Sequence, residues 1–388
     1  LPDVPTTIDQ LIGKGKQQIT LDQVDIGAVT NYAASDADYT WQLCHQLHPQ
    51  IAAVAGISDI FTQLEMPLID VLVRMEQAGI CVDAPYLHEL SARVTARIAS
   101  LESEIHAIAG ASFNIASSDQ LSDVLFGKLG LPTQGLETTK TGRYSLTAEV
   151  LEKLRGSDQS LIIERILQHR QLSKLKSTYI DALPELINPH TGRVHTSYNQ
   201  LGAATGRLSS VEPNLQNIPT RTEEGREVRR AFVAAPGHLL IAADYSQIEL
   251  RVLAHITEDP NLLQAFHEDQ DIHAATAAQL FGVAVADVDK NQRRIAKTTV
   301  FGVIYGISAF GLAQRTNLSR TESQALIDGL FARFPRVKDY IESTKAQARA
   351  TGYVTSLFGR RRAIPEINIK GPRQQARSEE HTSELQSR

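Results

Sequence analysis

Four side chains that could hold a phosphorylated ligand recur every four residues in the segment RRIAKTTVFGVIYG. They are Arg293, Lys297, Phe301 and Tyr305. A helix places such residues on one slowly drifting stripe, ~18 Å long. The cations come first, where the helix dipole also attracts anions, and the aromatic rings follow. This order matches a nucleoside triphosphate. The alternative, an ordinary amphipathic helix with its basic residues in water, would not favour mixing cations with aromatics.

A second candidate is the carboxylate of Asp244, in the segment HLLIAADYSQIELRVLAHI. The apolar run predicts a buried strand over residues 238–244, then a tight turn and a helix to Ile256. A carboxylate at the end of a buried strand is costly unless it is paired or binds a metal. Mg²⁺ takes carboxylate oxygens together with substrate phosphates. Asp244 could equally cap the following helix, so both readings stay open on this segment alone.

The composition is that of a globular protein with local basic clusters. The 388 residues are 42% hydrophobic and 21% charged, with a net charge of -5, so nucleic-acid binding would depend on clusters rather than on total charge. Cys44 and Cys81 lack the spacing of a disulfide framework or zinc site, which fits a reducing cytosol. No run approaches the ~20 apolar residues of a membrane span. We expect a soluble, cytoplasmic protein without membrane contacts.

The basic clusters all follow residue 165, and any one of them could also be an ordinary solvated surface. They are Arg170, Lys174 and Lys176; Arg221, Arg226, Arg229 and Arg230; Lys290, Arg293, Arg294 and Lys297; and Arg360, Arg361 and Arg362.

The surrounding sequence predicts a helical part, a part with strands, a helical insertion and a return to the strands, an α+β fold. Residues 1–60 have the pattern of the end of an α/β domain. Helical patterns cover residues 28–47, 66–79, 87–108, 148–177 and 259–350. Residues 131–145 predict a loop. Further strands are expected at residues 194–198, 206–208 and 352–358.

Several segments resemble motifs of the family A DNA polymerases, of the bacterial DNA polymerase I kind. DYSQIELR (residues 244–251) resembles motif A, and RRIAKTTVFGVIYG (residues 293–306) resembles motif B. The other similar segments are TGRLSS (205–210), PNLQNIPTR (213–221), DIHAATA (271–277) and GYVTSLFGRRR (352–362). All of them follow the order of the family, and the resemblance runs from about Thr6 to Ala376.

The resemblance implies a right-hand polymerase. Its expected parts are a remnant of a 3′–5′ exonuclease domain (1–60), the thumb (66–183), the first part of the palm (184–257), the fingers (258–350) and a returning palm strand (351–376). The implied activity is template-directed addition of dNTPs to a primer 3′ end by two-metal phosphoryl transfer, in DNA replication and repair. The implied partners are primer–template DNA, dNTPs and two Mg²⁺ ions, and we expect a monomer.

The resemblance also assigns roles to single residues. Asp244 would bind both Mg²⁺ ions with the Tyr245 carbonyl as a further ligand, and Lys297 would assist the departure of pyrophosphate. Glu249 would exclude a ribose 2′-hydroxyl, supported by Tyr305, and Phe301 would pack against the sugar. Gln247 is a further expected nucleotide contact. The triphosphate would be held by Arg221, His273, Arg293 and Lys297.

Primer and template would be contacted in the minor groove, whose acceptors are nearly the same for every correct base pair. The residues implied there are Arg207, Asn214, Gln216 and Asn217. Asn and Gln after a Pro often only form turns, and that alternative stays open. Further basic residues expected on DNA are Arg170, Lys174, Arg360 and Arg361.

YAASDAD near the N-terminus resembles the third exonuclease motif of the same family, with Tyr32 and Asp36 as its reactive pair. A proofreading site needs further carboxylates, which would precede Leu1, so we expect an inactive remnant. A helix with surface acids is the plain alternative.

The C-terminal end raises the question of catalytic completeness. The family supplies a second aspartate from a His-Asp-Glu motif downstream of the strand at Gly352, which the sequence does not reach. The final segment, RSEEHTSELQSR, looks like a translated sequencing adapter, so residues 377–388 are expected to be a non-native tail; a natural polar C-terminus is the alternative. We expect a truncated polymerase of absent or impaired activity. The second hypothesis is a non-catalytic fragment that binds primer–template DNA.

Overall fold

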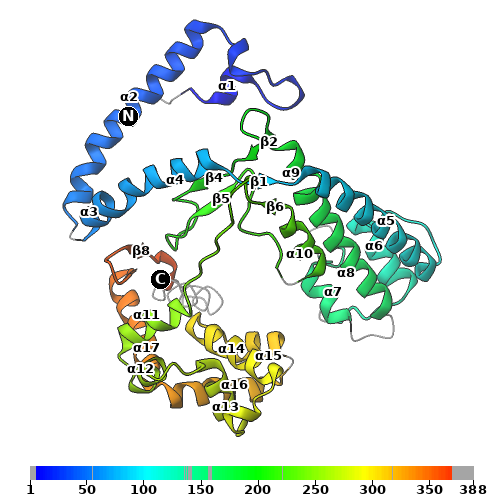
Figure 1. Cartoon of the computed structure of the whole chain (residues 1–388), viewed down its shortest axis with the longest axis vertical. Helices are drawn as coiled ribbons and strands as arrows, with labels where there is room; N and C mark the ends of the chain where they lie inside the picture. The colour runs from blue at the N-terminus through cyan, green and yellow to red at the C-terminus, as the bar shows by residue number, and fades with distance from the viewer. Residues whose placement is uncertain are drawn as a thin grey trace. The chain divides into compact units, whose positions relative to one another are not determined.

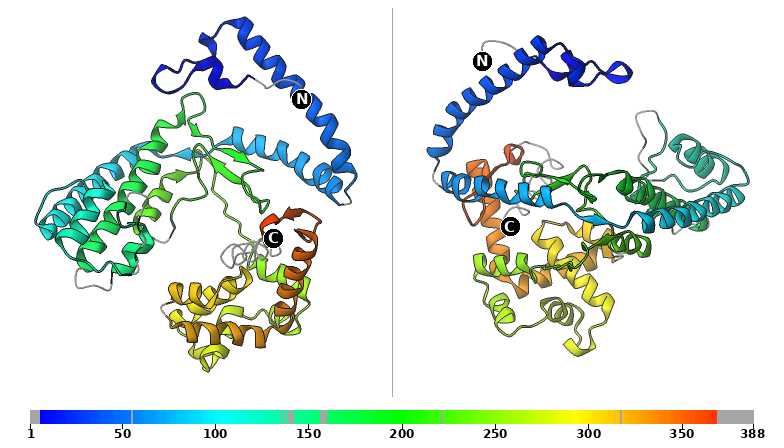
Figure 2. Two further views of the ribbon diagram at one scale, coloured as in Figure 1. Left: turned by 180° about the vertical axis from the view of Figure 1, so that it is seen from behind. Right: turned by 45° about the horizontal axis from the view of Figure 1, so that its top comes forward.

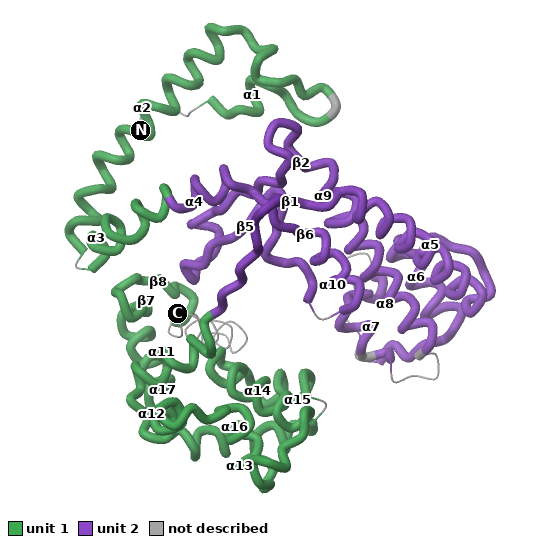
Figure 3. The backbone as a smooth tube through the Cα atoms, in the orientation of Figure 1, with its two compact units in different colours: residues 1–70, 245–388 green, residues 71–244 purple. Residues whose placement is uncertain are grey.

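The computed structural model describes residues 6–368 apart from residues 55, 135, 137, 139–141, 156–159, 221 and 317. The expected non-native tail, residues 377–388, lies outside the described residues. The chain divides into two compact units, Val71–Asp244 and Leu1–Asp70 with Tyr245–Arg388 (Figure 3). Most described residues are helical, and every strand is two or three residues long (Figure 1). Both kinds of element predicted for an α+β fold occur, but helices dominate.

The unit Val71–Asp244 contains two long neighbouring helices, α5 and α8, which pack along each other (Figure 2). α5 is capped at its start by Asp83, whose side chain accepts from Tyr86 N, and at its end by Gly110, which has a left-handed φ of 62°. The helices are the end of α4 (Met66–Ala78), α5 (Ala84–Ala109), α6 (Ser118–Ser122), α7 (Ala148–Leu154), α8 (Ser160–Leu175), α9 (Ala182–Glu185) and α10 (Glu223–Arg230), with π-helical turns at Asp123–Lys128 and Lys176–Ile180. The helices predicted over residues 66–79, 87–108 and 148–177 are confirmed. Within the last of these ranges, α7 ends before Arg155, which is a turn residue.

The strands of this unit form three separate antiparallel pairs. They are β1 (Cys81–Val82) with β6 (Phe232–Val233), β2 (Ile187–Asn188) with β3 (Arg193–Val194), and β4 (Ser197–Asn199) with β5 (Ser209–Val211). The strand predicted at residues 194–198 is present as β3 and β4, interrupted at His195 and Thr196. The strand predicted at residues 206–208 was wrong, because Gly206 has a φ of 80° that a strand does not accommodate; β5 follows it.

The buried strand predicted at residues 238–244 is not formed. These residues have no strand partner among the described residues, and Leu239 and Ile241 are 89% and 92% exposed. An apolar segment becomes a buried strand only where neighbouring strands complete its backbone hydrogen bonds and other elements cover its side chains. The prediction was wrong because an apolar pattern does not show whether such neighbours exist.

The residues from Tyr245 onward form a helical body that ends in a hairpin. Its helices are α11 (Ile248–Thr257), α12 (Pro260–His267), α13 (Ile272–Phe281), α14 (Lys290–Ile304), α15 (Ala309–Thr316), α16 (Arg320–Arg333) and α17 (Pro335–Thr351), with 3-10 turns at Val285–Asp287 and Pro365–Asn368. Its core includes Leu250, Leu262, Ile272, Val300, Leu312 and Leu330. The helices predicted over residues 259–350 are confirmed. The strand predicted at residues 352–358 is shorter, as β7 (Tyr353–Thr355), and pairs with β8 (Arg361–Ala363).

The described residues before Met66 are helices and turns. They form α1 (Ile8–Ile12), α2 (Ile26–Ala52), α3 (Ile57–Ile60), 3-10 turns at Gly15–Gln17 and Leu21–Gln23, and a π-helical turn at Phe61–Glu65. α2 extends the helix predicted over residues 28–47 at both ends. Its earlier start is explained by Asp25, which caps it by accepting from Gly27 N and Ala28 N. No residue of α2 is buried. The described residues there contain no strand, and the reading of residues 1–60 as the end of an α/β domain stays a prediction.

One fully buried carboxylate, that of Asp259, joins two helices of the C-terminal body. Its Oδ1 accepts from Asn261 N (3.1 Å) and Leu262 N (3.2 Å), and so caps α12. Its Oδ2 accepts from Arg336 N (3.1 Å) in the first turn of α17. The N-termini of α12 and α17 are therefore held together by the same side chain.

Asp259→Ala is expected to lower the free energy of unfolding by about 2–3 kcal/mol, because it removes two helix caps and leaves buried N–H groups without an acceptor. Urea unfolding followed by circular dichroism would measure this. Asp339→Ala, at an exposed position of α17, is the matched control and should change stability by less than ~0.5 kcal/mol. Equal effects of the two substitutions would contradict the double-cap role.

Candidate functional site

The predicted stripe lies on α14, a helix that begins at a capping box. The Asp289 side chain accepts from Gln292 N (2.7 Å), and the Gln292 side chain accepts from Asp289 N (3.0 Å). Arg293 and Lys297 are exposed, and Phe301 and Tyr305 are half-buried. The opposite face is buried in the core, through Ile295, Ala296, Thr299, Val300 and Val303. The helix and the solvent-facing cationic part of the stripe are confirmed.

α13 packs beside α14 and adds two side chains to the stripe. Asp271, the N-cap of α13, accepts from Arg293 Nε at 2.8 Å. The ring of His273 lies 5.5 Å from that of Phe301, centroid to centroid, and Lys297 Nζ lies 6.0 Å from the Phe301 centroid. Two cations, an imidazole, a carboxylate and a phenyl ring thus come together from two helices.

His273 is a buried histidine, 3% exposed, whose Nδ1 has no hydrogen-bond partner among the described residues. Burial lowers its pKa to about 4; Asp271 opposes this shift, while the charges of Arg293 and Lys297 add to it. The imidazole is therefore neutral at neutral pH. A neutral imidazole can take part in a hydrogen bond without adding charge.

The candidate metal-binding residue, Asp244, and the stripe on α14 belong to different compact units. Asp244 is exposed and belongs to the unit Val71–Asp244, whereas Tyr245, 80% exposed, begins the other unit. A pairing of Asp244 with the stripe therefore stays a prediction. Gln247, with a left-handed φ of 50°, precedes α11, and its buried Oε1 has no partner in the described part of the chain. Glu249 is half-buried in the first turn of α11.

The segment predicted to contact the minor groove is supported by buried hydroxyl groups. Thr196 Oγ1 and Ser210 Oγ lie 2.7 Å apart, and Thr196 Oγ1 also lies within hydrogen-bond distance of Pro213 O (2.8 Å). Ser210 Oγ accepts from Leu215 N at 3.1 Å. These contacts join the residue that precedes β4, the strand β5 and the residues that follow β5. They fix the backbone from which Asn214, Gln216 and Asn217 project.

The side-chain oxygens of Asn214 and Gln216 stabilise a turn, while their side-chain amide nitrogens make no hydrogen bond within the described residues. Asn214 Oδ1 accepts from Gln216 N (3.1 Å), and Gln216 Oε1 accepts from Ser210 N (3.2 Å). The alternative that these residues form a turn is therefore correct for their side-chain oxygens. No described residue accepts from their amide nitrogens, and both side chains are exposed, as are those of Arg207 and Asn217. Amide N–H groups are suited to the acceptors of the minor groove.

The basic residues predicted on DNA differ in their surroundings. Lys174 is exposed. Arg170 is half-buried and donates to Leu146 O at 2.5 Å, and burial lowers its pKa, so its contacts are those of a structural residue. Arg360 forms an ion pair with Glu65. The Arg361 guanidinium lies 4.8 Å from the centroid of the Tyr353 ring. Arg221 lies outside the described residues.

The predicted exonuclease pair lies on the exposed helix α2. Tyr32 donates to Asp36 one turn later, and this hydrogen bond is the main reason that the pKa of Tyr32 is raised. Within the described residues, no three or more His, Cys, Asp or Glu side chains gather as a metal site. In the structure, Tyr32 and Asp36 are side chains of a helix with acidic residues on its surface.

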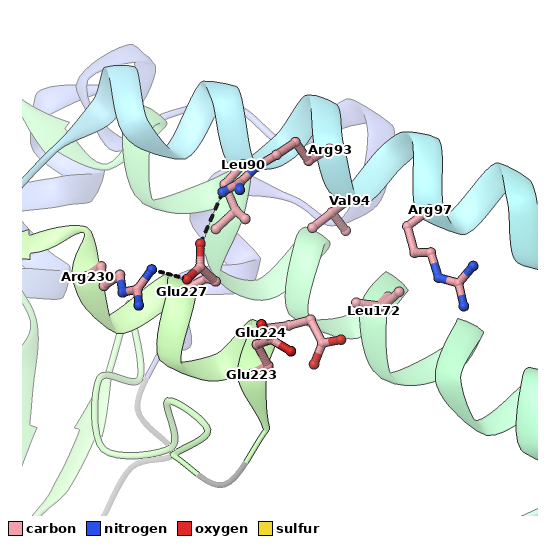
Figure 4. Close-up of a pocket in the computed structure, with 9 residues that line it drawn as sticks. All are labelled: Leu90, Arg93, Val94, Arg97, Leu172, Glu223, Glu224, Glu227 and Arg230. Atoms are coloured by element: carbon pink, nitrogen blue, oxygen red, sulfur yellow. Dashed lines mark hydrogen bonds and ion pairs between the residues drawn. The ribbon is translucent and has the colours of Figure 1, made fainter.

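A groove of about 370 Å³ lies between α5, α8 and α10, and Figure 4 shows its lining. Glu227 of α10 accepts from Tyr86 Oη (2.9 Å) and Arg93 (3.1 Å), and forms a further ion pair with Arg230. The hydrogen bond from Tyr86 is the main cause of the lowered pKa of Glu227; burial opposes it. The groove contains none of the predicted nucleotide-binding residues. Its charged groups fix α10 against α5.

Sequence reasoning missed the role of Asp271. The residue opens the segment DIHAATA, and an aspartate just before a helical pattern is a start signal. That signal predicts the cap on α13. It does not predict the contact with Arg293, which is 22 residues further along the chain.

A family model described as DNA polymerase family A matches residues 84–384. The DNA polymerase I of Chloroflexus aurantiacus is 57% identical over 382 residues, which are 98% of this chain and 40% of that protein. The thermostable DNA polymerase I of Thermus aquaticus is 52% identical over 344 residues, 89% of this chain and 41% of that protein. The chain thus spans about 40% of the length of these curated relatives.

Among solved structures, the POL domain of Pol1 from M. smegmatis, in complex with DNA primer-template and dNTP, has a TM-score of 0.82 and 36% sequence identity. The match covers 89% of this chain and 60% of that one. In the described part of this chain, no helix has the length and apolar character to cross a membrane.

The His273 ring is expected to titrate in a ¹H–¹³C NMR experiment with a midpoint near pH 4 rather than at its ordinary value of 6.5. Between these values the unfolded chain binds the proton and the folded chain does not, so stability should fall as the pH drops from about 6.5 towards 4. His273→Gln identifies the resonance and should flatten this part of the pH dependence. A midpoint at or above 6.5 would contradict the buried, neutral imidazole.

Proposed function

The chain belongs to DNA polymerase family A, and on this premise we propose that it holds primer–template DNA and a dNTP for template-directed addition at a primer 3′ end. The observation that carries the proposal is the surface of α13 and α14. There, exposed cations, a neutral buried imidazole and an aromatic ring follow one another along a helix. The dNTP complex of the M. smegmatis relative supports the same ligand class.

The phosphates of the dNTP would bind Arg293, Lys297 and His273, with Arg221 as a further cation. Phe301 would pack on the sugar. Glu249 would exclude a 2′-hydroxyl with the support of Tyr305, and Gln247 would add a further contact. In the reaction, the primer 3′-hydroxyl attacks the α-phosphate in line, and Lys297 stabilises the departing pyrophosphate.

The DNA would lie against the amide nitrogens of Asn214, Gln216 and Asn217, with Arg207 beside them. Hydrogen bonds from such groups check the geometry of a base pair without reading its sequence. Lys174 and Arg361 remain candidates for phosphate contacts. Arg170 and Arg360 are weaker candidates, because a backbone carbonyl and Glu65 already engage them.

Mg²⁺ would be held by the Asp244 carboxylate and the Tyr245 carbonyl, whose oxygens are the donor type that this ion takes. When bound, it supplies charge that stabilises the attacking and leaving oxygens. A two-metal site also needs a second carboxylate.

We further propose the division into exonuclease remnant (1–60), thumb (66–183), palm (184–257 and 351–376) and fingers (258–350). The proposed exonuclease remnant includes Tyr32 and Asp36. The second candidate function is non-catalytic binding of primer–template DNA. It requires that no further carboxylate joins Asp244 at the metal site.

Primer extension by a completed enzyme tests the proposal. Residues 1–376 would be joined to the downstream part of the C. aurantiacus polymerase and assayed with dNTPs and Mg²⁺ beside the chain as printed. The chimera should extend the primer, and Asp244→Ala should abolish extension without weakening DNA binding. Glu249→Ala should relax the exclusion of ribonucleotides, because the bulk that meets the 2′-hydroxyl is removed.

Extension by the Asp244→Ala chimera would contradict the proposal that Asp244 binds Mg²⁺. Unchanged selection of dNTPs over ribonucleotides by Glu249→Ala would contradict the proposal that Glu249 excludes the 2′-hydroxyl. Robust extension by the chain as printed would rule out the non-catalytic hypothesis.

A further inference from the structure

Asp271 joins α13 to the stripe on α14 through both of its carboxylate oxygens. Oδ1 accepts from the N–H groups of His273 and Ala274, at 3.0 Å each, and caps α13. Oδ2 accepts from Arg293 Nε at 2.8 Å. One carboxylate therefore fixes the start of one helix and the guanidinium carried by the other.

This contact leaves the outer end of Arg293 available. A guanidinium is a rigid planar fork, and only its Nε donates to Asp271. No described residue accepts from Nη1 or Nη2, and the Arg293 side chain is 47% exposed. The two terminal nitrogens are the pair that binds phosphate oxygens side by side.

The negative charge of Asp271 is balanced by groups of the protein beside it. Burial raises the pKa of its carboxyl, but hydrogen bonds from Arg293 and from the backbone of Ala274 outweigh burial and hold the pKa below its usual value. The carboxylate is therefore ionised at neutral pH. The N-terminus of α13 and Arg293 both stabilise it.

We propose that Asp271 is a positioning residue for the incoming dNTP: it holds Arg293 by Nε so that the terminal guanidinium nitrogens are set to bind the triphosphate. The inference rests on the proposed function of the stripe. Asp271 itself would not touch the nucleotide.

The opposite role, in which Asp271 competes with phosphate for Arg293, fits the geometry less well. A competitor must be able to release Arg293, but Oδ1 is bound to two backbone N–H groups of α13. α13 is in turn fixed by its buried Ile272 and by its packing against α14. The Asp271 carboxylate is therefore fixed at the start of α13, and it contacts the Arg293 guanidinium only through Nε.

Asp271→Asn separates the two contacts of the carboxylate. Asparagine is as good a helix cap as aspartate, so Oδ1 keeps its role. The amide nitrogen that replaces Oδ2 cannot accept from Arg293 Nε. Asp287→Asn is the control, because it makes the same charge change at an exposed residue of the same helical body. Asp271→Ala removes both contacts.

The measurement is the dissociation constant of a fluorescent dATP analogue with Mg²⁺, by anisotropy, on the full chain. Asp271→Asn should weaken binding about two- to fivefold, the loss of one half-exposed ion pair, with no change in melting temperature. Asp287→Asn should not weaken it. Removing a negative charge should by itself favour a polyanion, so weaker binding has the opposite sign to the charge effect. In an Arg293→Ala background, Asp271→Asn should have no further effect.

Unchanged or tighter binding by Asp271→Asn would overturn the positioning role, as would an equal loss of affinity in the Arg293→Ala background. No binding by the unsubstituted chain would be a different result. It would contradict the proposed nucleotide site itself, and the role of Asp271 with it.

Discussion

The burial of one face of α14 decides which of its side chains can meet a ligand. Ile295, Val300 and Val303 are buried in the helical core, so Arg293 and Lys297 are directed to the solvent side. α13 packs on the same helix and brings the ring of His273 next to that of Phe301. The cationic, aromatic and neutral polar groups of the proposed nucleotide site thus follow from the packing of two helices.

Two carboxylates, the buried one of Asp259 and the exposed one of Asp271, each link two helices of this body. Asp259 and Asp271 each cap one helix with Oδ1 and bind a second helix with Oδ2, through Arg336 N and Arg293 Nε respectively. A helix cap is a local contact, but the second oxygen links helices far apart in sequence. In both cases an aspartate that caps one helix also binds the neighbouring helix.

The sequence alone was enough for features that depend on neighbouring residues. The four-residue spacing from Arg293 to Tyr305 predicted a helix with one mixed stripe; α14 carries Arg293, Lys297 and Phe301, and Tyr305 directly follows its last residue. Features that need a distant partner were missed or wrong. The apolar segment at residues 238–244 predicted a buried strand that has no partner among the described residues. The basic pattern at Arg170 did not reveal that its guanidinium binds a backbone carbonyl.

The most direct test of the central claim is protection of Lys297 from amine acetylation, measured by mass spectrometry with and without dATP and Mg²⁺. Lys338, an exposed lysine of α17, is the reference. The triphosphate should slow acetylation of Lys297 but not of Lys338, and deoxyadenosine, which lacks phosphates, should slow neither. Equal acetylation of Lys297 with and without saturating dATP would contradict the assignment of the α14 stripe as the phosphate-binding surface.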